Sequence, residues 1–352
     1  MKKLVFLLMG CGPGGIELQI PNIVNNLKDM EPIVYVIHGL RTNANNNIFA
    51  GTEINTNLGA RRLPQSAFSL YRFARKNKDM IFHGFNIGPI FLMVLKIARV
   101  KKIIYGIRGT IYWRNGIQKL VFGLFWKMAL SDKIKLISNS DYSARKFKEL
   151  IWPQAKITKI YNAIDTERFY FKRSNYTVVP KKIIYVGRLA KGKNLYLWLD
   201  IAKLIGEYYL QTEFHIFGDG SLRNELKNYT QNIRVEGKVT FHGYIKDVEQ
   251  AYKFGDLMIF LSDHESFGNV VVESIIAGTP VICSAIPSFQ EIFKNYPEFL
   301  VNLDDNTADL VLQKISAYKD LTELTIKAQA EFVSLFNIEN HIRQLRQIYN
   351  DF

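Results

Sequence analysis

The chain alternates short, unbroken apolar runs with stretches of helical spacing, and it does so in two successive series. Leu4–Met9 opens the first series and Lys181–Val186 opens the second. An unbroken apolar run is typical of a parallel strand that is buried on both faces. Strands that alternate with helices predict an α/β doubly wound domain, so the sequence predicts two of them. A length of 352 residues fits two domains of ordinary size.

Each half contains further short runs that are predicted to be strands. In the first half they lie at Ile33–Ile37, Met80–Phe82, Ile103–Ile107 and Lys135–Ser138. In the second half they lie at Glu213–Phe217, Val239–Phe241, Leu257–Leu261 and Pro280–Cys283. The Asn-rich stretch Arg41–Asn57 is predicted to be a loop, and the polar, irregular stretch Phe169–Pro180 is the predicted linker. Paired domains of this kind predict a ligand site in the cleft between them, at the carboxyl ends of the strands.

The beginning of the chain imitates two motifs that it does not fully match. Leu4–Met9 is shorter than the 7–15 apolar residues of a typical signal peptide, so a first buried strand is favoured over secretion. Gly10-Cys-Gly-Pro-Gly-Gly15 fits the dinucleotide fingerprint, which also requires an acidic residue about 20 positions on. The second strand ends at His38 and Glu31 precedes it, so a nicotinamide or flavin enzyme is disfavoured. A glycine loop before a helix still suits any phosphate group.

The net positive charge of the chain lies entirely in its first half. Residues 1–170 carry 26 Lys+Arg and 10 Asp+Glu, a net +16, whereas residues 171–352 carry a net −2. No acidic residue occurs between Asp79 and Asp132, where basic residues are interleaved with aromatic ones. This pattern favours an anionic membrane surface or single-stranded nucleic acid. A buried helix with a solvated basic edge is the structural alternative. The membrane contacts we expect are Lys96, Lys101, Lys102, Trp113, Lys119 and Trp126.

Neither the cysteines nor the apolar segments indicate an extracellular or membrane-spanning chain. Cys11 and Cys283 are too few for a disulfide framework, which favours a reducing compartment. The most apolar stretch, Ile117–Leu130, is interrupted by lysines and is shorter than the roughly 20 residues that a membrane span needs.

The second half contains residues suited to binding phosphate and sugar. Gly187-Arg188-Leu189 follows a strand, and Lys193 lies five positions after Arg188. A guanidinium group offers a planar fork to phosphate oxygens and an ammonium group adds a compact charge. Glu265 and Glu273 are eight positions apart, and Gly268 and Asn269 between them are predicted to open a helix. That places Glu273 near the first turn, where a carboxylate can accept hydrogen bonds from a diol. The structural alternatives are a solvated loop and a helix-dipole partner.

At this point the sequence resembles a known family, the retaining glycosyltransferases of family GT4, which have the GT-B fold. The resemblance covers nearly the whole chain and is strongest in the second half. The order and spacing of the matching segments are together more specific than any single segment. The matching pieces are Gly14-Gly15-Ile16-Glu17, Ser138-Asn139-Ser140, Tyr161-Asn162-Ala163-Ile164-Asp165, Arg168-Phe169, Tyr185–Ala190, Lys193-Asn194, Phe217–Gly220, Phe241–Tyr244, Glu265–Glu273, Ala277-Gly278 and Pro280-Val281.

The resemblance implies two Rossmann-like domains that face each other across a cleft. We expect an acceptor-side domain at residues 1–168, a domain that binds the sugar donor at 169–330, and a C-terminal helix at 331–352 that packs back on the first domain. The implied activity is hexosyl transfer from a nucleotide sugar, with UDP-sugars preferred, in surface polysaccharide biosynthesis. The implied acceptor is a glycan or a polyprenyl-diphosphate-linked intermediate, and the protein is expected to be cytoplasmic and peripheral at the inner face of the plasma membrane.

The resemblance also implies roles at the matched positions. The residues expected to carry catalysis are Arg188 and Lys193, on the diphosphate, and Glu265, on the sugar. The residues expected to bind the sugar donor are Gly14, Gly15, Gly187, Gly218, Gly243, Tyr244, Phe267, Gly268, Asn269, Val270 and Glu273. Glu273 is assigned to the ribose diol, and residues 267–270 contribute backbone N–H groups. No metal and no cofactor are expected, and no Asp-x-Asp pair occurs in the chain.

One departure from the family pattern affects the first domain. Relatives carry a His after the fourth or fifth strand, whereas this chain has Arg108 in the matching stretch Tyr105–Thr110. Arg108 is not a base but suits phosphate or the acceptor. His83 is the nearest alternative, or it is a buried core histidine. Two other function classes remain open: a basic nucleic-acid-binding protein, and a non-catalytic protein that binds sugar nucleotides. The residues leave the oligomeric state undetermined.

Overall fold

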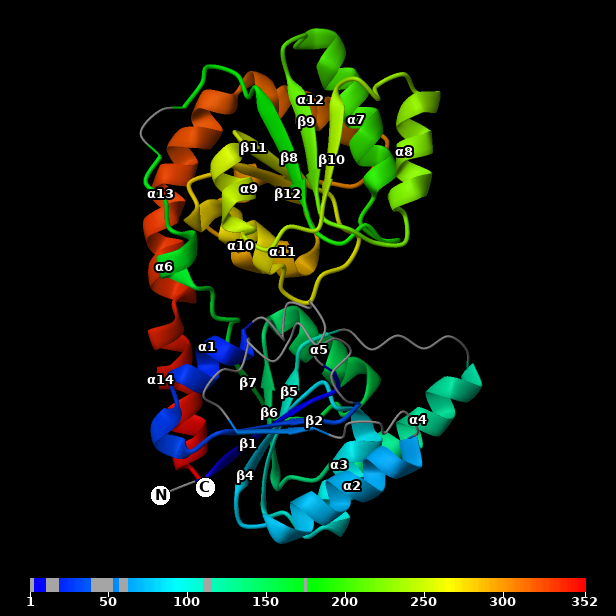
Figure 1. Cartoon of the computed structure of the whole chain (residues 1–352), viewed down its shortest axis with the longest axis vertical. Coiled ribbons are helices and arrows are strands. Elements are labelled where there is room, and N and C mark those ends of the chain that lie inside the picture. The colour runs from blue at the N-terminus through cyan, green and yellow to red at the C-terminus, as the bar shows by residue number, and fades with distance from the viewer. Residues whose placement is uncertain (1–2, 11–18, 39–52, 57–62, 110–115, 174–175) are drawn as a thin grey trace. The chain divides into compact units, whose positions relative to one another are not determined.

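A computed structural model describes residues 3–10, 19–38, 53–56, 63–109, 116–173 and 176–352, with side chains from 53–56 and 116–119 left aside. The chain divides into two compact units. The first comprises Met1–Ala163 together with Ile338–Phe352, and the second comprises Ile164–Asn337. These bounds differ by a few residues from the predicted divisions after residues 168 and 330. Figure 1 shows the elements of both units.

The first unit is built on a parallel sheet of seven strands in the order β3-β2-β1-β4-β5-β6-β7. Its strands are β1 (Leu4–Leu8), β2 (Ile33–Val36), β3 (Glu53–Thr56), β4 (Ile81–Phe85), β5 (Lys102–Ile107), β6 (Ile134–Ser138) and β7 (Ile157–Lys159). Its helices are α1 (Ile20–Asn25), α2 (Leu63–Lys76), α3 (Gly88–Ile97), α4 (Gly116–Ala129), α5 (Asp141–Leu150) and α14 (Ile338–Asn350), with a 3₁₀ turn at Lys28–Met30. The strand order reverses between β1 and β4, as in a Rossmann domain.

The second unit repeats this arrangement with a parallel sheet in the order β10-β9-β8-β11-β12-β13. Its strands are β8 (Lys182–Val186), β9 (Glu213–Phe217), β10 (Val239–Gly243), β11 (Leu257–Phe260), β12 (Val281–Ser284) and β13 (Leu300–Val301). Its helices are α6 (Thr166–Phe169), α7 (Leu195–Tyr208), α8 (Arg223–Asn232), α9 (Glu249–Phe254), α10 (Asn269–Ile276), α11 (Pro287–Ile292), α12 (Thr307–Ser316) and α13 (Tyr318–Phe336), with a 3₁₀ turn at Pro297–Phe299. Here the order reverses between β8 and β11.

The central strands of both sheets are buried on both faces, as their unbroken apolar runs predict. All five residues of β1 are buried, with Leu4 and Phe6 in one core cluster and Val5 and Leu7 in the other. The two clusters cover opposite faces of the first sheet because successive side chains of a strand point to opposite faces. The prediction of two doubly wound α/β domains is therefore confirmed.

The structure corrects the prediction of a loop at Arg41–Asn57. Residues Glu53–Thr56 form β3, which pairs in parallel with β2 at the edge of the first sheet. The segment Glu-Ile-Asn-Thr contains one strongly apolar residue, so its own pattern carries no strand signal. The hydrogen bonds of the neighbouring strand determine its conformation.

The C-terminal segment is two helices where one was expected from residue 331. The first of them, α13, runs through Glu331 to Phe336, and α14 starts at Ile338. Between them, Asn337 has extended backbone angles, and its side-chain amide donates to the carbonyl groups of Val333 and Ser334. This residue ends α13, and α14 then packs in the core of the first unit beside α1.

Candidate functional site

Two glycine loops meet at the carboxyl ends of the neighbouring strands β8 and β9, next to the point where the strand order of the second sheet reverses. The loop after β8 contains Gly187 and the loop after β9 contains Gly218. A Cβ atom on Gly218 would lie 1.8 Å from the Gly187 carbonyl oxygen, and one on Gly220 would lie 2.2 Å from the Leu189 carbonyl oxygen. The loop after β9 therefore needs glycine at both positions to pack its backbone against the backbone of the loop after β8. In open α/β sheets, this edge beyond the carboxyl ends of the strands is where ligands bind.

Arg188 and Lys193 both lie in the segment that follows β8, in different surroundings. Arg188 is exposed, and no ion pair among the described residues involves its guanidinium group. Lys193 forms an ion pair with Glu265, and the side chain of each is 20% exposed. The Lys193 ammonium group also lies 5.3 Å from the centre of the Phe260 ring. The structure thus brings Lys193 and Glu265 together, 72 positions apart in the chain.

The first residues of α10 follow Glu265 at the same sheet edge. The helix begins at Asn269, as predicted, with Gly268 before it at φ = +94°. A Cβ on Gly268 would lie 2.3 Å from the Phe289 ring. The Phe267 side chain is buried against Phe336. Only the backbone of Phe267 can thus serve a ligand here, as the resemblance implies. The first N–H groups of any helix have no acceptor within it, and its dipole favours an anion at this end.

Glu273 lies on α10 near the first turn, as expected. It is the fifth residue of the helix, so its carboxylate is beyond the first turn. The Tyr252 hydroxyl, on α9, donates to Glu273 Oε2 at 2.8 Å. Burial raises the pKa of Glu273 to about 7, although the Tyr252 hydrogen bond and the Arg168 charge act in the opposite direction. Near neutral pH this carboxyl group is therefore poised between its two protonation states.

The end of β10 carries the residues expected near the base of a nucleotide. Gly243 has φ = +73°, and its carbonyl oxygen accepts from the Gly218 amide at 2.8 Å. Tyr244 follows with 62% of its surface exposed. Through this hydrogen bond, Gly243 lies beside the two glycine loops.

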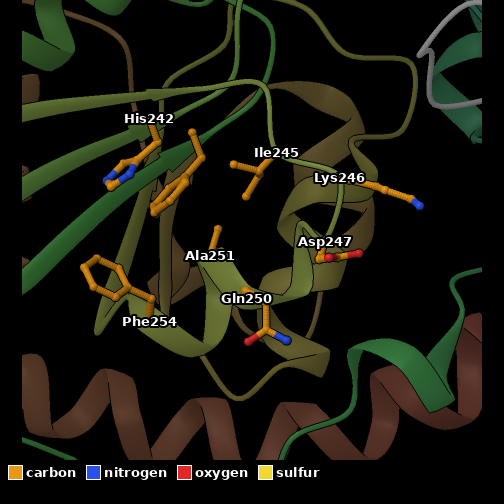
Figure 2. A pocket seen from close by; sticks show the side chains of 8 residues that line it. His242, Ile245, Lys246, Asp247, Gln250, Ala251 and Phe254 are labelled. Atoms are coloured by element: carbon orange, nitrogen blue, oxygen red, sulfur yellow. The ribbon is translucent and has the colours of Figure 1, made fainter. Parts of the chain in front are cut away.

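A pocket of about 410 Å³ adjoins this loop, between β10 and α9 (Figure 2). The His242 ring stacks on Phe217 with centroids 4.2 Å apart and planes 8° apart. His242 Nε2 lies 3.1 Å from His215 Nδ1, so only one of the two nitrogens carries a proton between them. Sequence reasoning missed both histidines. Their only signals were that His215 lies in the predicted strand Glu213–Phe217 and that His242 directly follows the predicted strand Val239–Phe241, within the matching piece Phe241–Tyr244. The pocket is lined by Phe217, His242, Ile245, Lys246, Asp247, Gln250, Ala251 and Phe254.

In the first unit, His83 and Arg108 belong to one buried cluster. His83 is completely buried, its Nδ1 lies 2.8 Å from the Tyr349 hydroxyl, and its ring stacks on Phe85. Burial holds the pKa of His83 well below its usual value. Arg108 is 6% exposed, donates to Asn162 and lies over the Phe85 ring. Burial lowers the pKa of Arg108 to about 10, so it stays charged at neutral pH. The burial of His83 matches the core-histidine alternative.

The structure corrects one of the six expected membrane contacts. Trp126 is 4% exposed because its ring packs against Tyr105 and Phe147 in the core, so it does not face solvent. Lys96 is exposed and donates to the Met128 carbonyl, and Lys101 pairs with Asp79 at 3.7 Å. Lys102 is half-buried at the start of β5. Four other candidates lie outside the described residues or side chains, namely Gly14, Gly15, Trp113 and Lys119.

The described residues offer neither a metal cluster nor a membrane span. No cluster of three or more His, Cys, Asp or Glu side chains there has the geometry to hold a metal ion. No helix in the same part of the chain is both long and apolar enough to cross a membrane.

Two family models match the chain in succession. The model described as Glycosyltransferase Family 4 matches residues 13–168, and the model described as Glycosyl transferases group 1 matches residues 167–327. The chain belongs to the GT4 glycosyltransferases. The two models meet within a few residues of the boundary between the structural units. The resemblance in the sequence is thereby confirmed.

Curated relatives of this glycosyltransferase include two from Escherichia coli. A UDP-Gal:alpha-D-GlcNAc-diphosphoundecaprenol alpha-1,3-galactosyltransferase is 26% identical over 307 residues, which cover 82% of this chain and 79% of the relative. The O-antigen biosynthesis glycosyltransferase WclY is 29% identical over 290 residues, which cover 77% of this chain and 79% of the relative.

Solved structures confirm the GT-B fold of this glycosyltransferase. Anabaena HepE in complex with UDP-glucose superposes with a TM-score of 0.81 at 19% identity, covering 100% of both chains. WaaG, a glycosyltransferase involved in lipopolysaccharide biosynthesis, superposes with a TM-score of 0.77 at 15% identity, covering 98% of this chain and 99% of WaaG. At these identities the likeness concerns the fold.

Proposed function

We propose that this glycosyltransferase moves a hexosyl group from a UDP-sugar to a glycan or lipid-linked acceptor in surface polysaccharide biosynthesis. The acceptor is presented at the inner face of the plasma membrane, where the protein binds peripherally. The printed names of the relatives support this class: one uses UDP-Gal and a diphosphoundecaprenol acceptor, and another acts in O-antigen biosynthesis. The HepE structure, with UDP-glucose bound, supports a UDP-sugar as substrate.

The observation that carries the proposal is the set of charged groups beyond the carboxyl ends of β8 and β11, which we call the β8/β11 edge. Arg188 presents an exposed guanidinium group after β8, and the Lys193–Glu265 pair links that segment to the loop after β11. The N-terminal end of α10 follows Glu265 directly. A diphosphate needs cations and N–H groups, and a hexose needs a hydrogen-bond acceptor for its hydroxyls. This edge supplies both.

The roles are those that the family resemblance implies, and the chemistry of each group suits its role. Lys193 has three N–H donors, so it can keep Glu265 and still donate to a phosphate oxygen. Arg188 binds the second phosphate, and Glu265 accepts from sugar hydroxyls. Glu273 accepts from the ribose diol. Within the second unit, the remaining contacts come mainly from backbone at Gly187, Gly218, Gly243, Tyr244, Phe267, Gly268, Asn269 and Val270.

Catalysis in this proposal is electrostatic. Breaking the anomeric bond leaves an oxocarbenium-like sugar and a nucleoside diphosphate with additional negative charge. Arg188, Lys193 and the start of α10 stabilise that leaving group. Lys193, held by Glu265, and the first N–H groups of α10 are in place before the reaction begins. The acceptor hydroxyl attacks from the same face from which the leaving group departs, so the anomeric configuration is retained. The leaving phosphate takes the proton of that hydroxyl. These cations supply the charge, so the proposed reaction needs no metal.

The test is the substitution Arg188→Ala. The sugar donor is first chosen by thermal shift against a panel of UDP- and GDP-sugars, because a ligand that binds only the folded state raises the melting temperature. Transfer is then measured with that compound. We expect kcat to fall by roughly 10²–10³, the usual effect of removing one group that stabilises transition-state charge. NMR of the wild-type product should show the anomeric configuration of the sugar donor. EDTA should leave the wild-type transfer rate unchanged.

Lys191→Ala is the matched control, because Lys191 is an exposed cation in the same segment. It should keep the wild-type rate. Equal rates in wild type and Arg188→Ala would disprove the assignment of this edge. If no sugar nucleotide raises the melting temperature and nucleic acid binds instead, the function itself is wrong.

A further inference from the structure

The solvent-facing side of α4 is an almost unbroken apolar surface. The side chains of Leu120, Leu124 and Met128 are 76%, 60% and 52% exposed, and their spacing of four residues places them in one row along the helix. Trp126 and Ala129 are buried on the opposite side. A helix that is apolar on all sides is normally enclosed by protein, so this exposed row requires an explanation.

The C-terminal end of α3 extends this surface. Lys96 donates to the Met128 carbonyl at 2.7 Å, so the ends of α3 and α4 lie together. Ile97, the last residue of α3, is 65% exposed. Figure 1 shows α2, α3 and α4 side by side in the first unit, and contacts join α2 to α3 and α3 to α4. We call Leu120, Leu124, Met128 and Ile97 the α4 ridge.

The three helices α2, α3 and α4 carry charge of one sign only. None of the three helices contains an acidic residue. Lys127 is exposed on α4 beside the ridge, and Lys96 is exposed beside Ile97. More exposed cations are on α2, at Arg72, Arg75 and Lys76. Helices with exposed aliphatic side chains and only positive charge are complementary to a negatively charged apolar layer.

We propose that the α4 ridge inserts into the boundary between headgroups and acyl chains of an anionic membrane, with Lys96 and Lys127 on the lipid phosphates. This combination of apolar and basic residues is that of interfacial helices. A second copy of the chain would bring positive charge against positive charge. Single-stranded nucleic acid stacks on aromatic rings, whereas the ridge is aliphatic. The α4 ridge would provide the membrane contact that the proposed function requires. Only the biological purpose of this contact rests on the proposed function.

The experiment is co-sedimentation of the full chain with lipid vesicles. One set contains phosphatidylcholine with phosphatidylglycerol, and the other contains phosphatidylcholine alone. We expect wild-type protein to bind the anionic set only. The variant Leu120→Ser/Leu124→Ser/Met128→Ser should bind at least about tenfold more weakly, because it removes most of the apolar area that would enter the membrane. Lys127→Gln should weaken binding about fivefold, the effect of one cation near the surface.

The matched control is Val178→Ser/Leu210→Ser. These residues of the second unit are 88% and 77% exposed, and the change removes comparable apolar surface away from α4. The control should bind as wild type does. Circular dichroism melting checks that each variant folds, and Lys127→Gln still tests the proposal if the triple variant does not.

Three outcomes would overturn the inference. One is equal vesicle binding by wild type, the triple variant and Lys127→Gln. Another is equal binding to both vesicle sets. A third is a dimer of the wild type that the triple variant loses while neither binds lipid, which would make the ridge an interface between copies. Hydrolysis of the sugar nucleotide without lipid should persist in the triple variant. Loss of vesicle binding with hydrolysis intact therefore concerns the α4 ridge, whereas absence of hydrolysis in wild type concerns the proposed function.

Discussion

At the scale of single residues, Glu273 shows how burial changes chemistry that the sequence alone presents as ordinary. Its carboxyl group accepts a hydrogen bond from Tyr252, and burial raises its pKa to about 7. In the unfolded chain the same group ionises near its ordinary value of 4.5. The folded state therefore holds a proton that the unfolded state releases between these two pH values.

This difference predicts how stability depends on pH. At Glu273 the folded state binds more protons between about pH 4.5 and 7, so the contribution of this group to the free energy of unfolding should fall as pH rises through that window, by up to about 3 kcal/mol. Glu273→Gln keeps an acceptor for Tyr252 and removes the titration. The lowered pKa of the buried His83 acts in the opposite direction in wild type and variant alike, so the slope that belongs to Glu273 is the difference between the two proteins. We expect the variant to lose this slope in urea unfolding measured from pH 5 to pH 8. The same slope in both proteins would show that Glu273 does not titrate in this window.

Sequence reasoning placed Glu273 correctly on the helix that begins at Asn269, because Gly-Asn before an apolar run is a local signal. It did not identify Tyr252 as its partner, because 21 positions separate the two and only packing of α9 on α10 brings them together. The same holds for Trp126. Its place among basic residues suggested a surface contact, while its ring fills a gap between Tyr105 and Phe147.

At the scale of elements, the start of α10 depends on one glycine. Gly268 has a left-handed backbone conformation, and the Phe289 ring occupies the space that a side chain would need. This allows the chain to turn from the loop after β11 directly into the helix. The first N–H groups of α10 are directed by this turn, so its geometry matters for ligand binding as well as for stability.

Gly268→Ala should therefore destabilise the protein by about 2 kcal/mol or more, from backbone strain and the clash with Phe289. Gly123→Ala is the control, because Gly123 lies inside α4 and a Cβ added there would have nothing within 4 Å. That substitution should stabilise the protein by about 0.5–1 kcal/mol, since alanine has the better helix propensity. Chemical denaturation checks both. No loss of stability in Gly268→Ala would contradict this account of the α10 start.

At the scale of the whole molecule, the chain returns to its first unit at the end. The final helix, α14, contributes Ile342, Leu345 and Tyr349 to the core cluster that covers one face of the first sheet. Tyr349 also contacts His83 of β4, 266 positions earlier. The first unit is thus completed only when the last residues of the chain are in place.

Leu345→Ala tests this dependence. Leu345 is fully buried, so its truncation should cost about 2–5 kcal/mol through lost burial and the cavity left behind. Gln347→Ala, on the exposed side of the same helix, should change stability by less than about 0.5 kcal/mol. Hydrogen exchange should show lost protection in β1 and β4, with little change in β8 and β11. Equal loss in both sheets would mean that the two units unfold together.

The sequence by itself determined the two series of strands, the opening of α10 at Asn269 and the family, because these depend on local patterns and on the order of short motifs. It also located the net charge of +16 in residues 1–170. Tertiary structure decided the rest. Pairing with β2 makes a strand of Glu53–Thr56, and packing buries His83 and Trp126 while leaving the α4 ridge exposed. The Lys193–Glu265 pair likewise exists only in the fold. Burial and pairing depend on neighbours distant in the chain, and local patterns carry no information about them.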